Sequence, residues 1–334
     1  MDYVEDMQRQ FTRILRICCL VVLALVVMLT MPLSVSYAAG NWHIQITDED
    51  LKKIADSTLT LMAFTVLPDV TTSSFSLNNG YSDNAGISQT TLGGGFTVSE
   101  EFPIYLEGTV GYSRYDPQFI ATRGTEQRLI PIKWNSLAAT GGIGWDFPLL
   151  PSKELKLRPI FNFSLGYVTT DLAFGQNFLN DKYNVDISIL DGGTMNAYGL
   201  GGAIMLDYEH YRDAYEIDVE LRYTRIQLQT YGSTSKGLKG SSENNSINLW
   251  ARWRAPTDIT LLKRPLRYVL ETSMTGFFGP QRGALGFDRL GSVGAGLELD
   301  SSAYLKLISR FRIIARYLLG DNVAGYSLGL AVSF

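Results

Sequence analysis

The last ten residues of the sequence, Gly325–Phe334, constrain the fold most, because large apolar side chains alternate there with small or polar ones without an error. The large apolar residues are Tyr326, Leu328, Leu330, Val332 and Phe334. Side chains alternate across a β-strand, so this stretch predicts a strand with one apolar face. Such a strand fits either the edge of a soluble sandwich or the closing strand of an outer-membrane barrel. In a barrel, these five residues would form the assembly signal.

Alternating strands recur from about Val70 to the end of the sequence, with turn residues between them. We expect about twelve strands. The expected spans are 70–78, 87–99, 103–115, 129–147, 155–172, 194–209, 214–231, 244–255, 265–278, 288–300, 303–319 and 325–334. Connections such as Ser99–Phe102 are short, whereas Asp116–Arg128, Ala173–Gly193 and Gly232–Glu243 are longer and mostly polar. Short periplasmic turns and longer external loops are typical of outer-membrane barrels.

Composition and the positions of aromatic residues favour the membrane over a soluble sandwich. Hydrophobic residues make up 46% of the chain, yet the mean hydropathy is only +0.03, as expected when apolar and polar side chains alternate. Rings recur near strand ends, where they would lie at the headgroup level of a membrane. They include Tyr112, Trp145, Tyr208, Tyr215, Trp253, Tyr317 and Tyr326. The sequence therefore predicts an all-β membrane protein, an antiparallel transmembrane barrel over residues 70–334.

The first 38 residues predict a signal peptide for export. Three arginines precede an apolar run, Ile17–Met31, and Ser36 and Ala38 provide small residues for cleavage before Ala39. The alternative is a membrane anchor, but the run has fifteen residues, fewer than the roughly 20 of a spanning helix. Both cysteines, Cys18 and Cys19, lie in this segment, so we expect no disulfide and no cysteine metal site in the mature chain.

A helical pattern precedes the first strand. Thr47 and the acidic residues after it suit a helix start, apolar residues continue to about Leu67, and Pro68 ends the pattern. We expect residues 39–69 to form a periplasmic tail and this helix. Its apolar side chains must be covered, and the lumen, the inner membrane surface and a partner are the three locations within reach. If the helix lies in the lumen, it should limit conduction through the barrel.

Charged residues fall on the polar face of several expected strands. On the lipid face, Arg or Lys would cost about 2–4 kcal/mol each at the midplane, so they must face inward. The expected luminal charge network consists of Glu216, Asp218, Glu220, Arg252, Arg254, Glu298, Asp300, Lys306, Arg310, Arg312 and Arg316. This network would either select solutes or fill the lumen with salt bridges.

The sequence offers little catalytic chemistry. The two histidines are His43, in the tail, and His210, in an expected inner turn, and no Gly-x-Ser-x-Gly motif is present. We expect no enzyme, no cofactor and no metal site. A net charge of -4 without a basic run gives no reason to expect nucleic acid. Expected partners are outer-membrane lipid, the barrel assembly machinery and small solutes.

A helix followed by about twelve strands and the end motif Tyr326–Phe334 resembles the translocator barrel of autotransporters. Only about ten residues separate the expected cleavage site from Thr47, whereas autotransporters carry a long passenger there. The chain is thus similar to solitary autotransporter-like barrels of the outer membrane. The resemblance implies a surface or structural barrel, or a narrow channel plugged by the helix. The alternatives are a solute-selective porin and, third, an outer-membrane hydrolase.

Overall fold

The structure is a computed structural model, and all the residues that it describes lie within 41–334. The described residues are 43–44, 55–60, 62–63, 71–78, 86–116, 118–123, 126–131, 133–170, 193–261, 264–279, 282–283, 286–300, 310–321 and 323–333. The expected signal peptide lies outside them and stays a prediction. None of the helices in these ranges is both long and apolar enough to cross a membrane.

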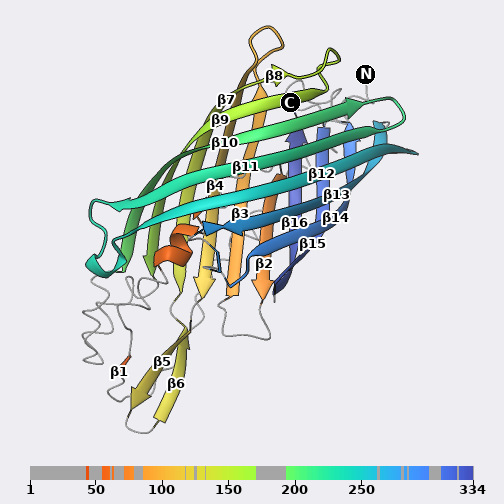
Figure 1. Cartoon of the computed structure of the whole chain (residues 1–334). Coiled ribbons are helices and arrows are strands. Elements are labelled where there is room, and N and C mark those ends of the chain that lie inside the picture. The colour runs from red at the N-terminus through yellow and green to blue at the C-terminus, as the bar shows by residue number, and fades with distance from the viewer. Residues whose placement is uncertain are drawn as a thin grey trace, which may run out of the picture. The chain divides into compact units, whose positions relative to one another are not determined.

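The main element is a closed antiparallel sheet (Figure 1). It has thirteen strands, of which the two-residue β8 (Phe147–Pro148) only flanks β9, so twelve form the ring. These are β2 (Thr71–Asn78), β3 (Gly86–Thr97), β4 (Ile104–Asp116), β7 (Trp134–Trp145), β9 (Leu155–Thr170), β10 (Thr194–Tyr211), β11 (Glu216–Tyr231), β12 (Ser241–Leu261), β13 (Arg264–Phe278), β14 (Arg289–Asp300), β15 (Arg310–Gly320) and β16 (Val323–Ser333). The ring closes because β16 pairs with β2, and β9 with β10. The predicted barrel and strand number are confirmed.

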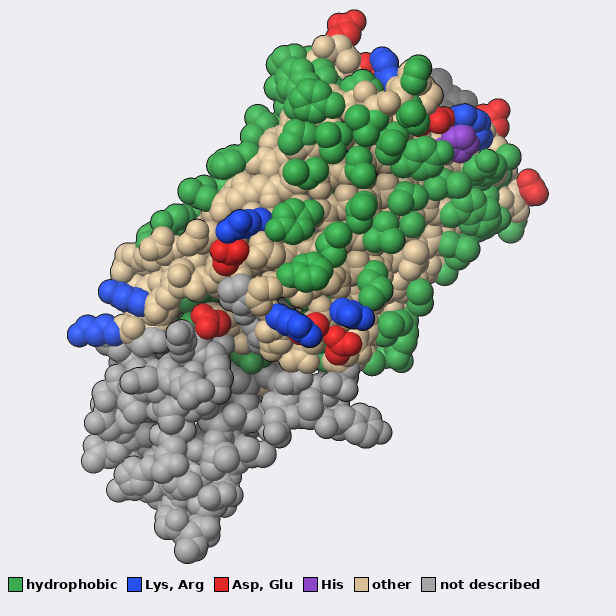
Figure 2. All heavy atoms as spheres, viewed as in Figure 1, with side chains coloured by type: hydrophobic (Ala, Val, Ile, Leu, Met, Phe, Trp, Pro, Cys, Tyr) green, Lys and Arg blue, Asp and Glu red, His purple; other side chains and the backbone are tan. Residues whose placement is uncertain are grey.

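The burial of side chains is the reverse of that in a soluble protein. Along β9, Phe163 is 50% exposed while the next residue, Ser164, is 1% exposed. The same alternation places Phe161 and Leu165 outside and Arg158 and Asn162 inside. Figure 2 shows hydrophobic side chains covering the middle of the wall on the face in view. An apolar outer wall around a polar interior, with no open edge in the ring, is the arrangement that a lipid bilayer requires. The chain is an integral outer-membrane β-barrel.

The two ends of the barrel differ in their connections. Residues 98–103 and 212–215 form short turns at one end, the upper end in Figure 1. At the other end, where β4 and β9 end and β7 and β10 begin, 17 residues separate Asp116 from Trp134 and 23 separate Thr170 from Thr194. We therefore name the ends periplasmic and external, respectively.

One external connection contains strands that the sequence did not predict. The expected loop Asp116–Arg128 includes a hairpin of β5 (Gln118–Arg123) and β6 (Glu126–Pro131), so the next wall strand begins at Trp134 and not at residue 129. β1 (His43–Ile44) pairs with β5, with His43 opposite Thr122. This pairing sets β1 against an external connection, although a periplasmic tail is the expectation for residues 39–69. Most of that segment lies outside the described residues.

β12 is longer than expected because it continues past a proline. The expected strand ends at Ala255, and the next residue, Pro256, has no N–H for the ladder. In the structure, the pairing with β13 shifts register between Pro256 and Thr260, and Asp258 adopts a φ of 60°. A bulge of this kind accommodates a proline within a sheet.

Candidate functional site: the lumen of the barrel

A helical segment occupies the external half of the lumen. It comprises residues 55–60 and 62–63, which is the described part of the expected helix. Leu59 and Met62 are fully buried within it. They belong to one apolar cluster with inward-facing residues of four neighbouring strands. The wall residues of this cluster are Trp134 and Ala138 of β7, Val168 of β9, Met195 and Ala197 of β10, and Ile226 and Leu228 of β11.

A glycine in the wall leaves space for the side chains of this helical segment. Gly166 of β9 faces inward, and a Cβ placed there would collide with the end of the Met62 side chain. A side-chain hydrogen bond joins Ser57 to Tyr115 of β4. Leu238, in the short 3₁₀ turn Lys236–Leu238 of an external connection, is buried in the same cluster. Leu238 was not predicted to lie in the lumen; its only signal in the sequence is that it is the single apolar residue of a polar loop.

A second apolar cluster lies at the external end, on other strands. It contains Phe277 of β13, Leu318 of β15, Val323 of β16 and Ile87 of β3, together with Phe287. Tyr115 packs against both this cluster and the one around Leu59. Apolar side chains therefore extend from β7 through Tyr115 to β16.

The periplasmic half of the lumen is filled by ion pairs. Arg254 of β12 lies 2.9 Å from Glu216, 3.0 Å from Asp218 and 3.4 Å from Glu298. Register explains part of this, because Glu216 and Arg254 are opposite each other across β11 and β12. Arg310 of β15 also reaches Glu216 of β11, at 2.9 Å, although three strands separate them in the wall. A bond between strands so far apart must cross the lumen.

Further ion pairs lie on the other side of the lumen and were not predicted. Arg158 of β9 pairs with Asp146 and, at 2.8 Å, with Asp207 of β10, and its guanidinium lies 3.9 Å from the centre of the Tyr105 ring. Arg222 of β11 contacts Glu107 of β4 at 2.7 Å. Asn162 also donates to Glu107. The signal in the sequence was available, since each of these residues is in phase with the inward face of its strand.

The structure brings together seven of the eleven residues of the predicted network. Those joined by ion pairs are Glu216, Asp218, Arg252, Arg254, Glu298, Arg310 and Arg312. Arg316, expected beside Glu298 and Asp300, instead pairs with Glu271 of β13 at 2.9 Å. Glu220 makes no ion pair with the described residues and lines a polar cavity of about 150 Å³ together with Arg158 and Arg252. Lys306 and the side chain of Asp300 lie outside the described residues.

The predicted assembly signal lies on the closing strand. Tyr326, Leu328 and Leu330 of β16 are exposed on the outer wall, and Ser327 and Ala331 on the opposite face are buried. The Tyr326 ring lies 5.4 Å from that of Tyr317 on β15. Phe334 and the side chain of Val332 lie outside the described residues.

The periplasmic rim carries the histidine whose side chain the structure describes. His210 lies between the rings of Tyr208 and Tyr215, and its Nδ1 is 3.1 Å from Glu154. Partial desolvation acts to raise the pKa of Glu154, but hydrogen bonds from Arg212 and His210 hold that pKa below its usual value. Within the part of the chain that the structure describes, no three His, Cys, Asp or Glu residues are grouped to hold a metal ion.

Solved structures of similar architecture include autotransporter domains and a porin. The chain is similar to the β-domain of the Bordetella autotransporter BrkA, at 16% identity and a TM-score of 0.42, over 78% of this chain and 97% of that domain. It is similar to the translocator domain of the autotransporter NalP from Neisseria meningitidis, at 12% identity and a TM-score of 0.41, over 79% and 86% of the two chains. It is also similar to the NanC porin, at 9% identity and a TM-score of 0.36, over 78% and 98%. No protein-family model and no curated protein matches the chain. Similarity at this level transfers no role, substrate or partner.

Proposed function

We propose that this outer-membrane barrel is an occluded structural barrel, closed in the resting state by the helical segment of residues 55–60 and 62–63. The observation that carries the proposal is the complete burial of Leu59 and Met62 against inward-facing residues of four wall strands. The second apolar cluster, joined through Tyr115, extends the closure toward β13, β15 and β16. An apolar filling excludes ions and polar solutes, because neither finds hydrogen-bond partners there.

The ion pairs support the same proposal from the periplasmic side. Arg310 to Glu216 and Arg222 to Glu107 are contacts between strands that do not pair in the wall, so these side chains span the lumen. Most of these carboxylates are engaged by arginines and hence are not free to bind a passing solute. The network therefore fills the lumen in preference to selecting solutes.

A solute-selective porin is the second candidate, and one observation favours it. The polar cavity of about 150 Å³ beside Glu220 is large enough for a few water molecules. An aqueous path would start from such a cavity. It would still have to pass the apolar cluster at the external end.

Conductance in planar bilayers tests the proposal. The full chain should conduct weakly, and deletion of residues 41–66 should raise single-channel conductance clearly while the barrel keeps its heat-dependent gel mobility. Deletion of residues 118–131, the β5–β6 hairpin, is the matched control, because it removes external residues but leaves the helical segment in place. Strong conductance of the full chain would favour the porin. Unchanged conductance after deletion of residues 41–66 would contradict the plug.

We also infer that the closing strand directs assembly. It presents an alternating apolar face on the outer wall, with Tyr326, Leu328 and Leu330 exposed. Removal of Phe334 should lower the amount of folded barrel in the outer membrane. Normal levels of the heat-modifiable form after this truncation would contradict the inference.

A further inference from the structure

The lipid-facing wall carries two shallow grooves that are built alike. Each surrounds an outward-facing glycine, has walls of large exposed apolar side chains, and has arginine at its external side. The first lies over β9, β10 and β11 with a volume of about 600 Å³, and the second over β12 and β13 with about 480 Å³. They adjoin at β11, since Tyr223 lines the first and Leu221, two residues away on the same face, lines the second.

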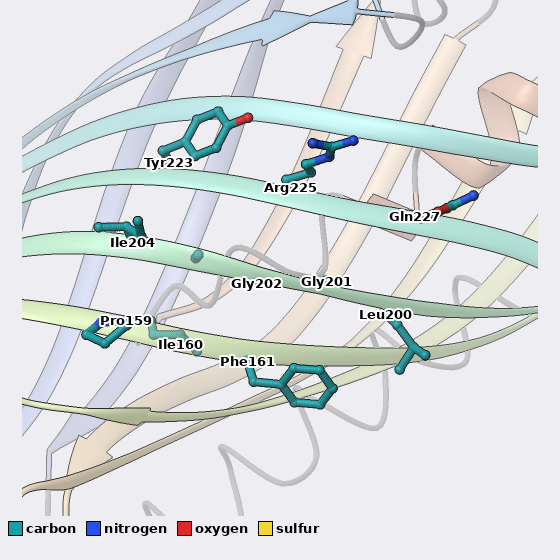
Figure 3. A pocket seen from close by; sticks show the side chains of 11 residues that line it. Pro159, Ile160, Phe161, Leu200, Gly201, Gly202, Ile204, Tyr223, Arg225 and Gln227 are labelled. Carbon is teal, nitrogen blue, oxygen red and sulfur yellow. The ribbon is translucent and has the colours of Figure 1, made fainter.

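The first groove is centred on Gly202. Gly202 is opposite Phe161 of β9 on one side and Arg225 of β11 on the other. A Cβ at Gly202 would lie 2.8 Å from the backbone oxygen of Ile160, so the close approach of β9 requires glycine here, but no side chain covers the position as the Phe163 ring covers Gly141 of β7. Figure 3 shows Phe161 and Leu200 on one side of the glycines, and Tyr223, Arg225 and Gln227 on the other. The floor of this groove is therefore accessible from the lipid-facing side of the wall.

The second groove repeats this construction around Gly276 of β13. Met274 and Phe278 on the same strand and Ile247 on β12 form its apolar walls. A Cβ at Gly276 would stand 3.5 Å from the Phe278 ring and 3.7 Å from Ile247, which is ordinary contact. The backbone therefore does not require glycine here, and the absent side chain leaves the groove open.

Arginines stand at the external side of both grooves. Arg225 is exposed and lies 3.2 Å from Glu243, and Arg282 lies 2.6 Å from Asp288. Arg289, exposed at the first residue of β14, makes no ion pair with the described residues. Charged side chains line the external edge of the hydrophobic band in Figure 2. At that level arginine can extend its guanidinium to the headgroup layer while its methylene groups stay against lipid.

We propose that this face of the barrel, from β9 to β14, binds a lipid of the external leaflet that carries two phosphates and several acyl chains. Acyl chains lie in the two glycine-centred grooves, and Arg225 and Arg289 bind phosphate. Guanidinium groups suit this role because they form paired, charge-assisted hydrogen bonds to phosphate oxygens.

A second copy of the chain fits this face less well. In a two-fold symmetric contact the same patch meets itself, so exposed arginines from both copies would be brought together. A phosphate-bearing lipid supplies the opposite charge instead.

Native mass spectrometry of the purified full chain in mild detergent tests the proposal. The probe is lipid A with two phosphates, compared with the same lipid after dephosphorylation and with phosphatidylglycerol. The phosphorylated glycolipid should bind best. Replacing both cations, in the variant Arg225→Gln with Arg289→Gln, should weaken its binding about tenfold or more, as expected for the loss of charge-assisted hydrogen bonds. Filling the second groove by Gly276→Leu should also weaken it.

Two variants serve as controls. Arg212→Gln removes an exposed cation at the periplasmic end, and Ala315→Leu enlarges an exposed wall residue on β15, outside both grooves. Neither should change binding. Equal binding of the dephosphorylated lipid or of phosphatidylglycerol to the unmodified chain would overturn the proposal without any variant. Unchanged binding by the double arginine variant, in its heat-modifiable folded form, would overturn it as well.

Discussion

The two halves of the lumen are filled in different ways. In the external half, a segment that precedes the first wall strand lies against the wall and makes mainly apolar contacts, through Leu59 and Met62. In the periplasmic half, the filling consists of the wall's own side chains, with Arg254 held by three carboxylates. The external filling is attached to the wall, whereas the periplasmic filling is part of it. Loss of the first should open the barrel, and loss of the second should unfold it.

This difference has an energetic basis. An apolar contact is lost gradually, since each buried side chain contributes about 1.5–3 kcal/mol. A buried ion pair behaves differently, because removal of one partner leaves the other charge buried without compensation, at about 3–5 kcal/mol. The arginines and carboxylates of the lumen should therefore be the most sensitive positions of the chain.

The largest effect should come from Arg254→Glu. This change places a carboxylate among Glu216, Asp218 and Glu298, so it removes three attractions and adds three repulsions. We expect a loss of at least about 3–5 kcal/mol in the free energy of unfolding. Urea unfolding followed by heat-dependent gel mobility measures it.

A charge exchange sharpens this test. Reversal of Arg252 and Arg254 to Glu together with Glu216 and Asp218 to Arg should recover part of the lost stability, since these residues face one another across β11 and β12. If the losses of the two sets simply add, the residues do not interact in the folded barrel.

The next largest effect should come from weakening the packing of the helical segment in the external half of the lumen. Leu59→Ala should weaken docking of the helical segment by about 2–5 kcal/mol, because Leu59 is fully buried. Conductance should rise while the unfolding midpoint of the barrel stays unchanged. Leu328→Ala, on the lipid-facing wall, is the control and should not raise conductance. A fall of the unfolding midpoint without a rise in conductance would mean that the segment belongs to the wall's own core.

The sequence predicted the wall better than its filling, and the reason is periodicity. In β14 from Val293 onward, and throughout β16, every second residue is apolar, so strand and face follow from local pattern alone. The extra hairpin β5–β6 and the extension of β12 past Pro256 were missed, because a short loop strand and a bulge leave no such period.

Ion pairs between luminal side chains were predicted only where the two strands are neighbours in the sheet. Glu216 and Arg254 are opposite each other on consecutive strands, so their contact could be expected. Glu107 and Arg222 lie on strands far apart in the wall, and their contact depends on the curvature that closes the barrel. No local pattern encodes that distance.

A smaller effect should follow from changing Gly166, the wall residue against which the helical segment packs. Gly166→Leu places a side chain where Met62 packs, so the segment must shift even though its own residues are intact. We expect conductance to rise less than after Leu59→Ala, because the far end of the Met62 side chain can move aside. Gly86→Leu is the matched control, since a Cβ there meets nothing within 4 Å. Equal conductance of the two variants would place the segment away from Gly166.

The smallest effect should appear at the periplasmic rim, where the same types of ion pair are exposed to water. Glu154 accepts hydrogen bonds from Arg212 and His210, which keep its pKa below the usual value. A carboxyl whose folded pKa is lowered contributes stability above its unfolded pKa, about 4.3, and loses that contribution as pH falls through the folded value. Glu154→Gln should therefore flatten the fall in stability below about pH 4 and change little at pH 7, because exposed pairs contribute little. Glu101→Gln, in another periplasmic turn, is the control for unfolding measured from pH 3 to pH 7. If Glu154→Gln instead unfolds the barrel at pH 7, the rim belongs to the same cooperative unit as the buried pairs around Arg254.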